Sequence, residues 1–349
     1  MRALRVLFVA VLVAAFVGGG AAWLLHERLT LPYQGYGGAE QFVELLPGDG
    51  TQVIGRKLVE AGVVRDRWVF RAAVWRLGAA RRLQAGEYRF DQPMTPLEVV
   101  ARLARGDVFL RTITFPEGLT IREMSRIFEA HGFGPASAFL SAAGEGALVH
   151  DIDPSARDLE GYLFPETYRL PRRAGASELV WMMLGRFRQV FSAAMRDAAK
   201  AHGLSARQTV TLASLVEKET ARPEERPLVA GVYLRRLRAG VALQCDPSVI
   251  YALEAADRYR GNLTRENLLF DSPYNTYRYP GLPPGPIAAP GRSSLDAAAR
   301  AVPGEYLYFV SRNDGSHVFA RTLDEHNRNV FKYQVEFYRL KRQEGSARH

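Results

Sequence analysis

The chain has 349 residues, of which 47% are hydrophobic and 24% charged, with 46 Lys and Arg residues against 37 Asp and Glu. This composition is typical of a globular protein and excludes intrinsic disorder or a fibrous repeat for most of the chain. The length predicts about two domains with an additional segment.

The cysteine and histidine content and the net charge exclude further classes of protein function. The single cysteine, Cys245, excludes an internal disulfide framework and a Cys-rich zinc site, and the seven His residues show no metal-ligand spacing. We therefore expect no metal and no other cofactor. The net charge of +9 comes from Arg residues spread along the whole chain without a nucleic-acid-binding motif, so we do not expect nucleic acid as a partner.

The N-terminus carries an uncharged run from Val6 to Leu25. As a helix it would be about 30 Å long, which matches the hydrocarbon thickness of a bilayer. Arg2 and Arg5 precede it, which predicts a cytoplasmic tail (1–5), a transmembrane anchor (6–25) and a remainder on the extracytoplasmic side. The alternative is a cleaved signal peptide with its cleavage site near Ala22. The apolar residues beyond that point favour the anchor in the inner membrane.

After a linker (26–40), residues 41–150 predict a small α+β region. Two similar stretches within it each contain a short β-type run, a turn, a Thr, and an amphipathic helix that ends at Gly. We expect Thr51 and Thr120 to cap their helices and Gly62 and Gly132 to end them.

Between these stretches we expect a strand over 86–90 and a helix over 96–105. Small βααβ units of this kind resemble LysM domains, which bind glycans. The alternative is a packing domain that holds the next domain away from the membrane.

Residues 151–345 predict a second domain of helices and short strands, so the fold class is α+β. We expect helices over 177–202, 205–220, 223–238 and 322–342, a Pro-rich loop over 270–290, and a hairpin of strands 306–310 and 317–320.

The helix over 205–220 contains two candidate carboxylates. Residues three and four apart share a helix face, so Glu217 lies on a face with small residues such as Ser214, where a ligand has room. Apolar surroundings would raise the pKa of Glu217 toward the range of a general acid. Glu219 points to the other side, where we expect an ion pair with Arg222. The alternative for both is an ordinary charged helix face.

Two further segments suit a saccharide cleft. The loop residues Tyr274, Asn275, Thr276 and Tyr277 combine aromatic faces with amide and hydroxyl groups. Gln244 and Asp246 follow a turn at the start of a predicted helix, where Asp is more often a cap than a catalyst.

Seven sequence blocks, in order, resemble the YceG-like family of endolytic murein transglycosylases. They are GYLFPETY (161–168), LASLVEKET (212–220), LQCDPSVIY (243–251), SPYNTY (272–277), GLPPGPIAAPG (281–291), YLYFV (306–310) and HVFARTLDEHN (317–327). Cys245 departs from the family, which commonly has Thr there.

The resemblance implies a lytic cleavage of the β-linkage between N-acetylmuramic acid and N-acetylglucosamine within nascent peptidoglycan strands. It implies Glu217 as the catalytic acid. Glu166, Ser214, Gln244, Asp246 and the 274–277 residues are the candidate substrate-binding residues, and cell-wall synthases at the membrane are candidate partners. Two alternatives stay open: a glycoside hydrolase with Asp246 or Glu166 as a second carboxylate, and a non-enzymatic wall-binding scaffold.

Overall fold

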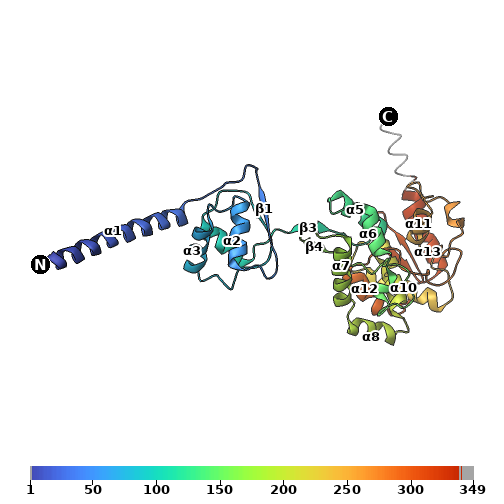
Figure 1. The fold of residues 1–349 in the computed structure, drawn as a ribbon. Helices are drawn as coiled ribbons and strands as arrows, with labels where there is room; N and C mark the ends of the chain where they lie inside the picture. Colours follow the sequence, from blue (N-terminus) through green and yellow to red (C-terminus); the bar gives the residue numbers. More distant parts are fainter. Residues whose placement is uncertain (1, 338, 340–349) are drawn as a thin grey trace. The chain divides into compact units, whose positions relative to one another are not determined.

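The computed structural model describes residues 2–337 and 339 and divides the chain into two compact units (Figure 1). Unit 1 holds the chain up to Arg111 together with Arg169–Arg173, and unit 2 holds Thr112–Tyr168 and the chain from Ala174 onward. The division therefore differs from the predicted boundary at residue 150, because residues 112–150 belong to unit 2.

Aromatic packing explains this difference. The Phe115 ring lies 6.1 Å from that of Phe139 and 6.4 Å from that of Tyr168, and Phe128 lies 5.4 Å from Phe139. The contact with Tyr168 leads out of the segment, and the Gly118 amide also donates to the Ala289 carbonyl at 2.8 Å, so the segment after residue 112 is joined to the rest of unit 2. The functions assigned to the two predicted domains remain predictions.

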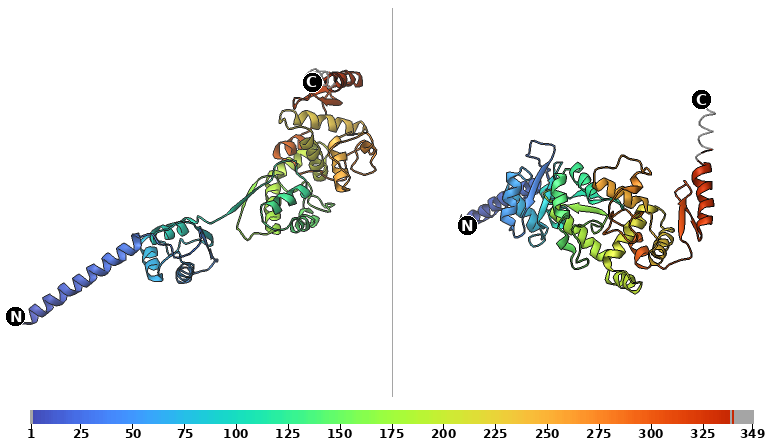
Figure 2. Two further views of the ribbon diagram at one scale, coloured as in Figure 1. Left: turned by 90° about the horizontal axis from the view of Figure 1, so that it is seen from above. Right: turned by 90° about the vertical axis from the view of Figure 1, so that its right-hand side faces the viewer.

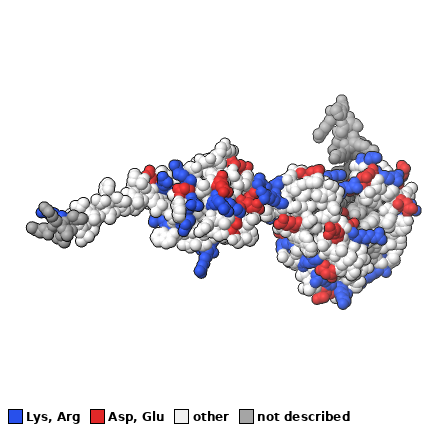
Figure 3. All heavy atoms as spheres, in the orientation of Figure 1, with Lys and Arg blue, Asp and Glu red and all other residues white. Residues whose placement is uncertain are grey.

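The N-terminal helix α1 (Arg2–Thr30) includes a 24-residue stretch, Leu7–Thr30, that is long and apolar enough to cross a membrane. In the described part of the chain it is the one helix with this property. Figure 3 shows its exposed surface as almost free of charge. Its last turn is tied to unit 1, because Leu29 is buried in the core and Arg28 Nη1 lies 3.5 Å from Asp66 Oδ2.

Unit 1 has the order β1 (Gln41–Leu45), α2 (Thr51–Glu60), α3 (Arg67–Arg76), β2 (Gly86–Phe90) and α4 (Pro96–Arg105). The two strands pair antiparallel, with Gln41 opposite Phe90 and Leu45 opposite Gly86. The predicted strand over 86–90 and helix over 96–105 are confirmed. The resemblance to LysM domains stays a prediction.

The predicted helix ends are mostly confirmed. Thr120 caps its helix through a capping box with Glu123, and Gly62 and Gly132 have φ values of +69° and +66°. The prediction for Thr51 is wrong, because Gly50 occupies the N-cap position and Thr51 is the first helical residue.

Unit 2 is mainly helical. Its elements are α5 (Ile121–Ala130), α6 (Ala136–Ala143), the 3₁₀ turn η1 (Gly146–Val149), α7 (Ala176–Val190), α8 (Ala193–Ala201), α9 (Ala206–Glu219), α10 (Arg226–Arg238), α11 (Asp246–Ala255), the 3₁₀ turn η2 (Asn267–Leu269) and α12 (Arg292–Ala299). Strands β3 (Arg111–Thr114) and β4 (Thr167–Leu170) pair where the chain passes between the units.

The helix predicted over 177–202 is two helices. The chain leaves the helical conformation at Phe191, which has ψ of 62°, and Ser192 then caps α8 by accepting a hydrogen bond from the Met195 amide. The apolar periodicity continues across this break, which is why the sequence pattern did not reveal it.

The C-terminal part of unit 2 forms a small layer. Strands β5 (Tyr308–Ser311) and β6 (His317–Ala320) form the predicted hairpin, with positive φ at Asn313 and Gly315. Helix α13 (Leu323–Val330) and a π-helical turn, η3 (Phe331–Glu336), pack on it (Figure 2). The predicted closing helix beyond residue 337 lies mostly outside the described residues.

Candidate active site

Helix α9 forms the base of the site. Ser205 caps it through a capping box with Gln208, and α9 contacts α8, α10, α11 and α12. Every residue from Thr209 to Val216 is buried, and the two carboxylates of the helix, Glu217 and Glu219, both lie in its last turn. The helix ends at Glu219 because Thr220 is extended, with φ of −138° and ψ of 132°.

Ser214 has a structural role in α9. Its hydroxyl donates to the Thr211 carbonyl at 2.8 Å and accepts from the Ile287 amide at 3.0 Å, and the side chain is fully buried. These bonds fasten the 281–291 loop to the helix, so Ser214 is not positioned to touch a ligand.

Glu217 is enclosed by protein groups. Its Oε1 accepts from Arg226 Nη2 at 2.9 Å, its Oε2 accepts from the Gly291 amide at 2.9 Å, and its side chain is 5% exposed. Arg226 also lies 3.4 Å from Glu117. Arg226 and the Gly291 amide thus hold the two oxygens of Glu217, and the expected open face beside Glu217 stays a prediction.

The protonation of Glu217 reflects this enclosure. Burial raises its pKa, while the Gly291 amide and the Arg226 guanidinium oppose the rise. Each carboxylate oxygen has two lone pairs, so these two bonds leave acceptor sites on Glu217 for a further partner.

Glu219 lines a polar cavity of about 420 Å³ at the end of α9. The wall of this cavity also includes Gln244, Asp246, Tyr277, Ser311 and His317. These residues come from the start of α11, the 272–277 loop and the β5–β6 hairpin. Segments almost 100 residues apart in sequence thus converge at one cavity that holds the carboxylates of Glu219 and Asp246.

The groups around the Glu219 carboxylate shift its pKa. Its Oε1 accepts a hydrogen bond of 2.5 Å from the Tyr233 hydroxyl. Burial raises the pKa of Glu219, the Tyr233 hydroxyl and Cys245 thiol oppose that rise, and the negative charge of Asp246 adds to it. The net effect is a raised pKa, which is the property of a general acid.

The expected ion pair of Glu219 with Arg222 is wrong. Arg222 pairs with Glu224 at 3.6 Å and donates from Nε to the Gly315 carbonyl at 3.1 Å. Because α9 ends at Glu219, Arg222 does not lie one helical turn further along the same face.

A sequence model of the YceG-like family matches residues 43–332, which is most of the chain. The chain belongs to the YceG-like family.

Curated relatives of this family member share its length or exceed it. It is 27% identical over 329 residues to the endolytic murein transglycosylase of Bacillus subtilis, with 90% of each chain covered. It is 29% identical over 322 residues to the endolytic murein transglycosylase of Streptococcus pneumoniae strain D39, covering 82% of this chain but 57% of that protein.

A solved structure supports the fold of this family member. A crystal structure of a YceG-like protein from Listeria monocytogenes matches with a TM-score of 0.57 and 28% identity, over 83% of this chain and 98% of that one.

Of the predicted binding residues in this YceG-like chain, Gln244, Asp246 and Tyr277 meet at the cavity. The Tyr277 hydroxyl donates to Asp246 Oδ1 at 2.5 Å. Gln244 has a positive φ of 51°, an unusual conformation for a non-glycine residue. The backbone N–H of Gln244 donates to the Thr276 carbonyl at 3.1 Å, and this bond holds the turn before α11 against the 272–277 loop.

Asn275 and Thr276 support this arrangement from behind. Asn275 is fully buried, and its amide nitrogen donates to the Leu268 and Phe270 carbonyls at 3.0 and 2.7 Å. The Thr276 hydroxyl accepts from the Cys245 amide at 2.9 Å. They therefore position Tyr277 and α11 and do not line the cavity.

The two remaining predicted residues lie elsewhere in unit 2. Glu166 forms an exposed ion pair with Arg186 at 2.5 Å, and the Tyr274 ring packs 5.0 Å from that of Tyr251. Asp246 is the first residue of α11, which Cys245 precedes as N-cap, so Asp246 is not the cap that its position suggested.

His317 and Tyr233 are site residues that the sequence pattern did not single out. His317 Nδ1 lies 2.7 Å from Glu225 Oε2, and its amide donates to Glu225 Oε1 at 2.9 Å. Burial opposes ionisation of Glu225, yet the bonds from His317 and Thr220 outweigh it and lower the pKa of Glu225. The HVFA strand was the available signal, because its His is the one polar residue in an apolar run.

Proposed function

We propose that this chain is an endolytic murein transglycosylase that cleaves the β-1,4 linkage between N-acetylmuramic acid and N-acetylglucosamine inside nascent peptidoglycan strands. The names of its relatives support the substrate and the reaction class. The observation that carries the proposal is a single carboxylate with a raised pKa, Glu219, on the wall of a polar cavity.

The geometry favours Glu219 over Glu217 as the general acid. Glu219 lines a polar cavity beside its Tyr233 and Cys245 partners, whereas Glu217 is held by Arg226 and the Gly291 amide. A general acid must come within hydrogen-bond reach of the glycosidic oxygen. The sequence-based choice of Glu217 stays a prediction, and the experiment below compares the two.

The reaction needs one acid that changes roles. Protonated Glu219 donates its proton to the glycosidic oxygen, and the bond from the muramyl C1 to that oxygen breaks. The carboxylate then takes the proton of the muramyl C6 hydroxyl, and O6 bonds to C1. The products are a 1,6-anhydromuramyl end and a free N-acetylglucosamine hydroxyl, and no water is consumed. The nucleophile belongs to the substrate, so a second carboxylate is not required.

The other cavity residues suit a glycan. Gln244 supplies an amide, Tyr277 an aromatic face and Ser311 a hydroxyl, which are groups that bind sugar hydroxyls and ring faces. We propose that Gln244, Asp246 and Tyr277 hold the sugars on either side of the scissile bond.

Product analysis tests the proposal. Purified uncrosslinked glycan strands are incubated with the full chain, Glu219→Gln and Glu217→Gln, and the products are weighed by mass spectrometry. We expect anhydromuramyl ends from the wild type and Glu217→Gln, and almost none from Glu219→Gln. Loss of product in Glu217→Gln with retained activity in Glu219→Gln would make Glu217 the acid. No cleavage by the wild type would favour a wall-binding scaffold.

One observation favours a hydrolase as the second candidate. Asp246 lies on the same cavity wall as Glu219 and could activate a water molecule as a second carboxylate. Hydrolysis would give products heavier by one water, so the same spectra separate the two reactions.

We further propose that α1 anchors the chain in the inner membrane, with units 1 and 2 on the extracytoplasmic side. The length and apolar character of α1 support this, as do Arg2 and Arg5 at its start. The site would then lie beside newly made strands, where cell-wall synthases are candidate partners and the LysM-like region a candidate second glycan contact. Detection of the intact N-terminus in the membrane fraction tests the anchor.

A further inference from the structure

Helix α3 of unit 1 exposes a surface that the proposed reaction does not use. We call it the Trp–Arg face, and it consists of Arg67, Trp68, Arg71, Trp75 and Arg76. The Trp68 and Trp75 side chains are 62% and 85% exposed, while the opposite side of α3 is buried in the core. Tryptophan side chains exposed to this extent are uncommon on the surface of a soluble protein, and neighbouring ones mark an interaction site.

The charge of this face is one-sided. From Arg65 to Arg82 the chain contains six Arg residues and one acidic residue, Asp66. Asp66 is occupied, because it caps α3 and pairs with Arg28. Within the described residues, the Arg side chains of the Trp–Arg face form no ion pair with an acidic side chain. The guanidinium carbons of Arg67 and Arg71 instead lie over the Trp68 ring, 5.3 and 5.1 Å from its centroid.

The Trp–Arg face lies beside the end of the apolar helix. Asp66, the N-cap of α3, holds Arg28 of α1, and a cavity of about 260 Å³ is lined by Leu24, Arg28, Arg65 and Val69. Leu29 is buried in the core of unit 1. The start of α3 thus lies beside the last turn of α1, where the apolar helix ends.

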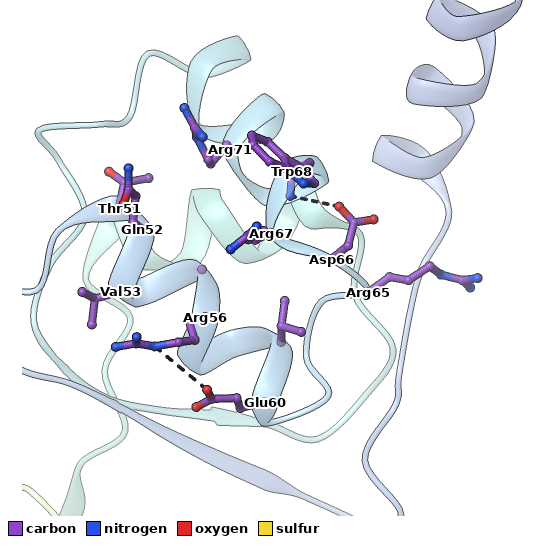
Figure 4. A pocket seen from close by; sticks show the side chains of 12 residues that line it. Thr51, Gln52, Val53, Arg56, Glu60, Arg65, Asp66, Arg67, Trp68 and Arg71 are labelled. Atoms are coloured by element: carbon purple, nitrogen blue, oxygen red, sulfur yellow. Dashed lines mark hydrogen bonds and ion pairs between the residues drawn. The ribbon is translucent and has the colours of Figure 1, made fainter.

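Figure 4 shows Trp68 and Arg71 side by side on the side of unit 1 from which α1 extends. They border a groove of about 700 Å³ between α2 and α3, whose wall also includes Arg65, Arg67 and Arg56, the last paired with Glu60 at 4.0 Å. If α1 spans a bilayer, this side of the unit faces the lipid headgroups.

We infer that the Trp–Arg face docks on the membrane surface from which α1 emerges, with an anionic phospholipid surface as its partner. Tryptophan prefers the headgroup level of a bilayer, and basic residues near an anionic surface each increase membrane partitioning by roughly fivefold. Arg also keeps its guanidinium at the phosphates while its stem lies on apolar surface. Docking would hold unit 1 against the bilayer, so that α1 and α3 together fix its orientation.

The inference rests on the proposed anchoring of α1, and the test measures anchoring separately. The chain has four tryptophans, Trp23 in α1, Trp68 and Trp75 on the Trp–Arg face, and Trp181 on α7. Trp181 is 55% exposed in unit 2 and serves as the matched control. Full-length chains that keep one tryptophan each, the others changed to Phe, are reconstituted in nanodiscs of phosphatidylglycerol that carries bromine near the headgroup.

We expect the emission of Trp23, Trp68 and Trp75 to fall at least about twofold relative to unbrominated discs, with Trp181 unchanged. Quenching of Trp68 and Trp75 should weaken in phosphatidylcholine discs, at high salt, and in an Arg67→Gln/Arg71→Gln/Arg76→Gln chain.

Quenching of Trp23 without quenching of Trp68 and Trp75 would overturn the docking and keep the anchor. Absence of Trp23 quenching would overturn the anchor. If soluble glycan strands change Trp68 emission while brominated lipid does not, the face binds glycan and the inference is wrong. None of these outcomes depends on glycan cleavage, so the proposed reaction is judged independently.

Discussion

The last turn of α9 places two glutamates, two residues apart, in opposite surroundings. Glu217 is 5% exposed and held by Arg226 and the Gly291 amide, whereas Glu219 borders a polar cavity and has the Tyr233 hydroxyl and the Cys245 thiol as partners. Burial raises the pKa of both. The comparison teaches that a raised pKa alone does not identify a catalytic acid, because the acid must also have space beside it for the substrate.

The largest expected effect separates these two residues. Proton transfer by a positioned acid contributes about 10²–10⁴-fold in rate, so Glu219→Gln should lose most of the anhydromuramyl product. The Glu217→Gln chain should keep its cleavage activity, because the side-chain oxygen of Gln can still accept the hydrogen bond from the Gly291 amide. Initial rates on purified glycan strands, with circular dichroism to confirm folding, measure both. An active Glu219→Gln chain beside an inactive, folded Glu217→Gln chain would reverse the comparison.

The second effect tests whether the Glu217–Arg226 pair is structural. Arg226→Gln leaves Glu217 buried without its cation, which should cost about 3–5 kcal/mol of unfolding free energy. Burial already raises the pKa of Glu217, and loss of Arg226 raises it further. A folded-state pKa above the unfolded value means that the folded chain holds the extra proton, so stability falls as the pH rises through that window.

The loss in Arg226→Gln should therefore be greater at pH 8 than near pH 5. Urea unfolding at both values measures it. The double variant Glu217→Gln/Arg226→Gln is the control, and it should recover part of the stability and lose the added pH dependence. Equal destabilisation at both pH values would show that Glu217 carries no buried charge.

How far the sequence predicted this arrangement depends on the range of the contacts involved. The Pro96–Arg105 helix, the capping of a helix by Thr120 and the hairpin of strands 306–310 and 317–320 were predicted well, because local propensity and turn chemistry determine them. The helical periodicity also placed Glu217 and Glu219 in different environments.

Which environment contained the cavity was not predictable in this way. It depends on Arg226 and Gly291 closing over one carboxylate, and on Tyr277 and His317 surrounding the other. These contacts join segments distant in sequence. Asn275 shows the same limit, since its amide looked suited to sugar but is used to hold the Leu268 and Phe270 carbonyls.

A smaller effect concerns the alkaline limb of the pH–rate profile. The acid must begin each turnover protonated, so activity falls as the pH rises past the pKa of Glu219. The Tyr233 hydroxyl binds the carboxylate and lowers its pKa. Tyr233→Phe should thus move this limb to higher pH, at a stability cost of about 1–3 kcal/mol. A limb that does not move would indicate that Glu219 is not the titrating acid.

The smallest expected effect has the opposite sign. The negative charge of Asp246 raises the pKa of Glu219, so Asp246→Asn should move the alkaline limb to lower pH. The rate on the acidic side should fall by no more than about tenfold, because the hydrogen bond from the Tyr277 hydroxyl to residue 246 is retained by the amide oxygen.

Asp246→Asn also distinguishes the two proposed reactions. In a transglycosylase Asp246 tunes the acid and binds sugar, so the variant stays active and its products stay anhydro. In a hydrolase Asp246 would activate the water, and its loss would abolish cleavage as fully as Glu219→Gln does. Rate profiles of Tyr233→Phe and Asp246→Asn that shift in opposite directions, with anhydro products from both, would place a single working carboxylate at Glu219. Shifts in the same direction would mean that these two side chains do not act through Glu219.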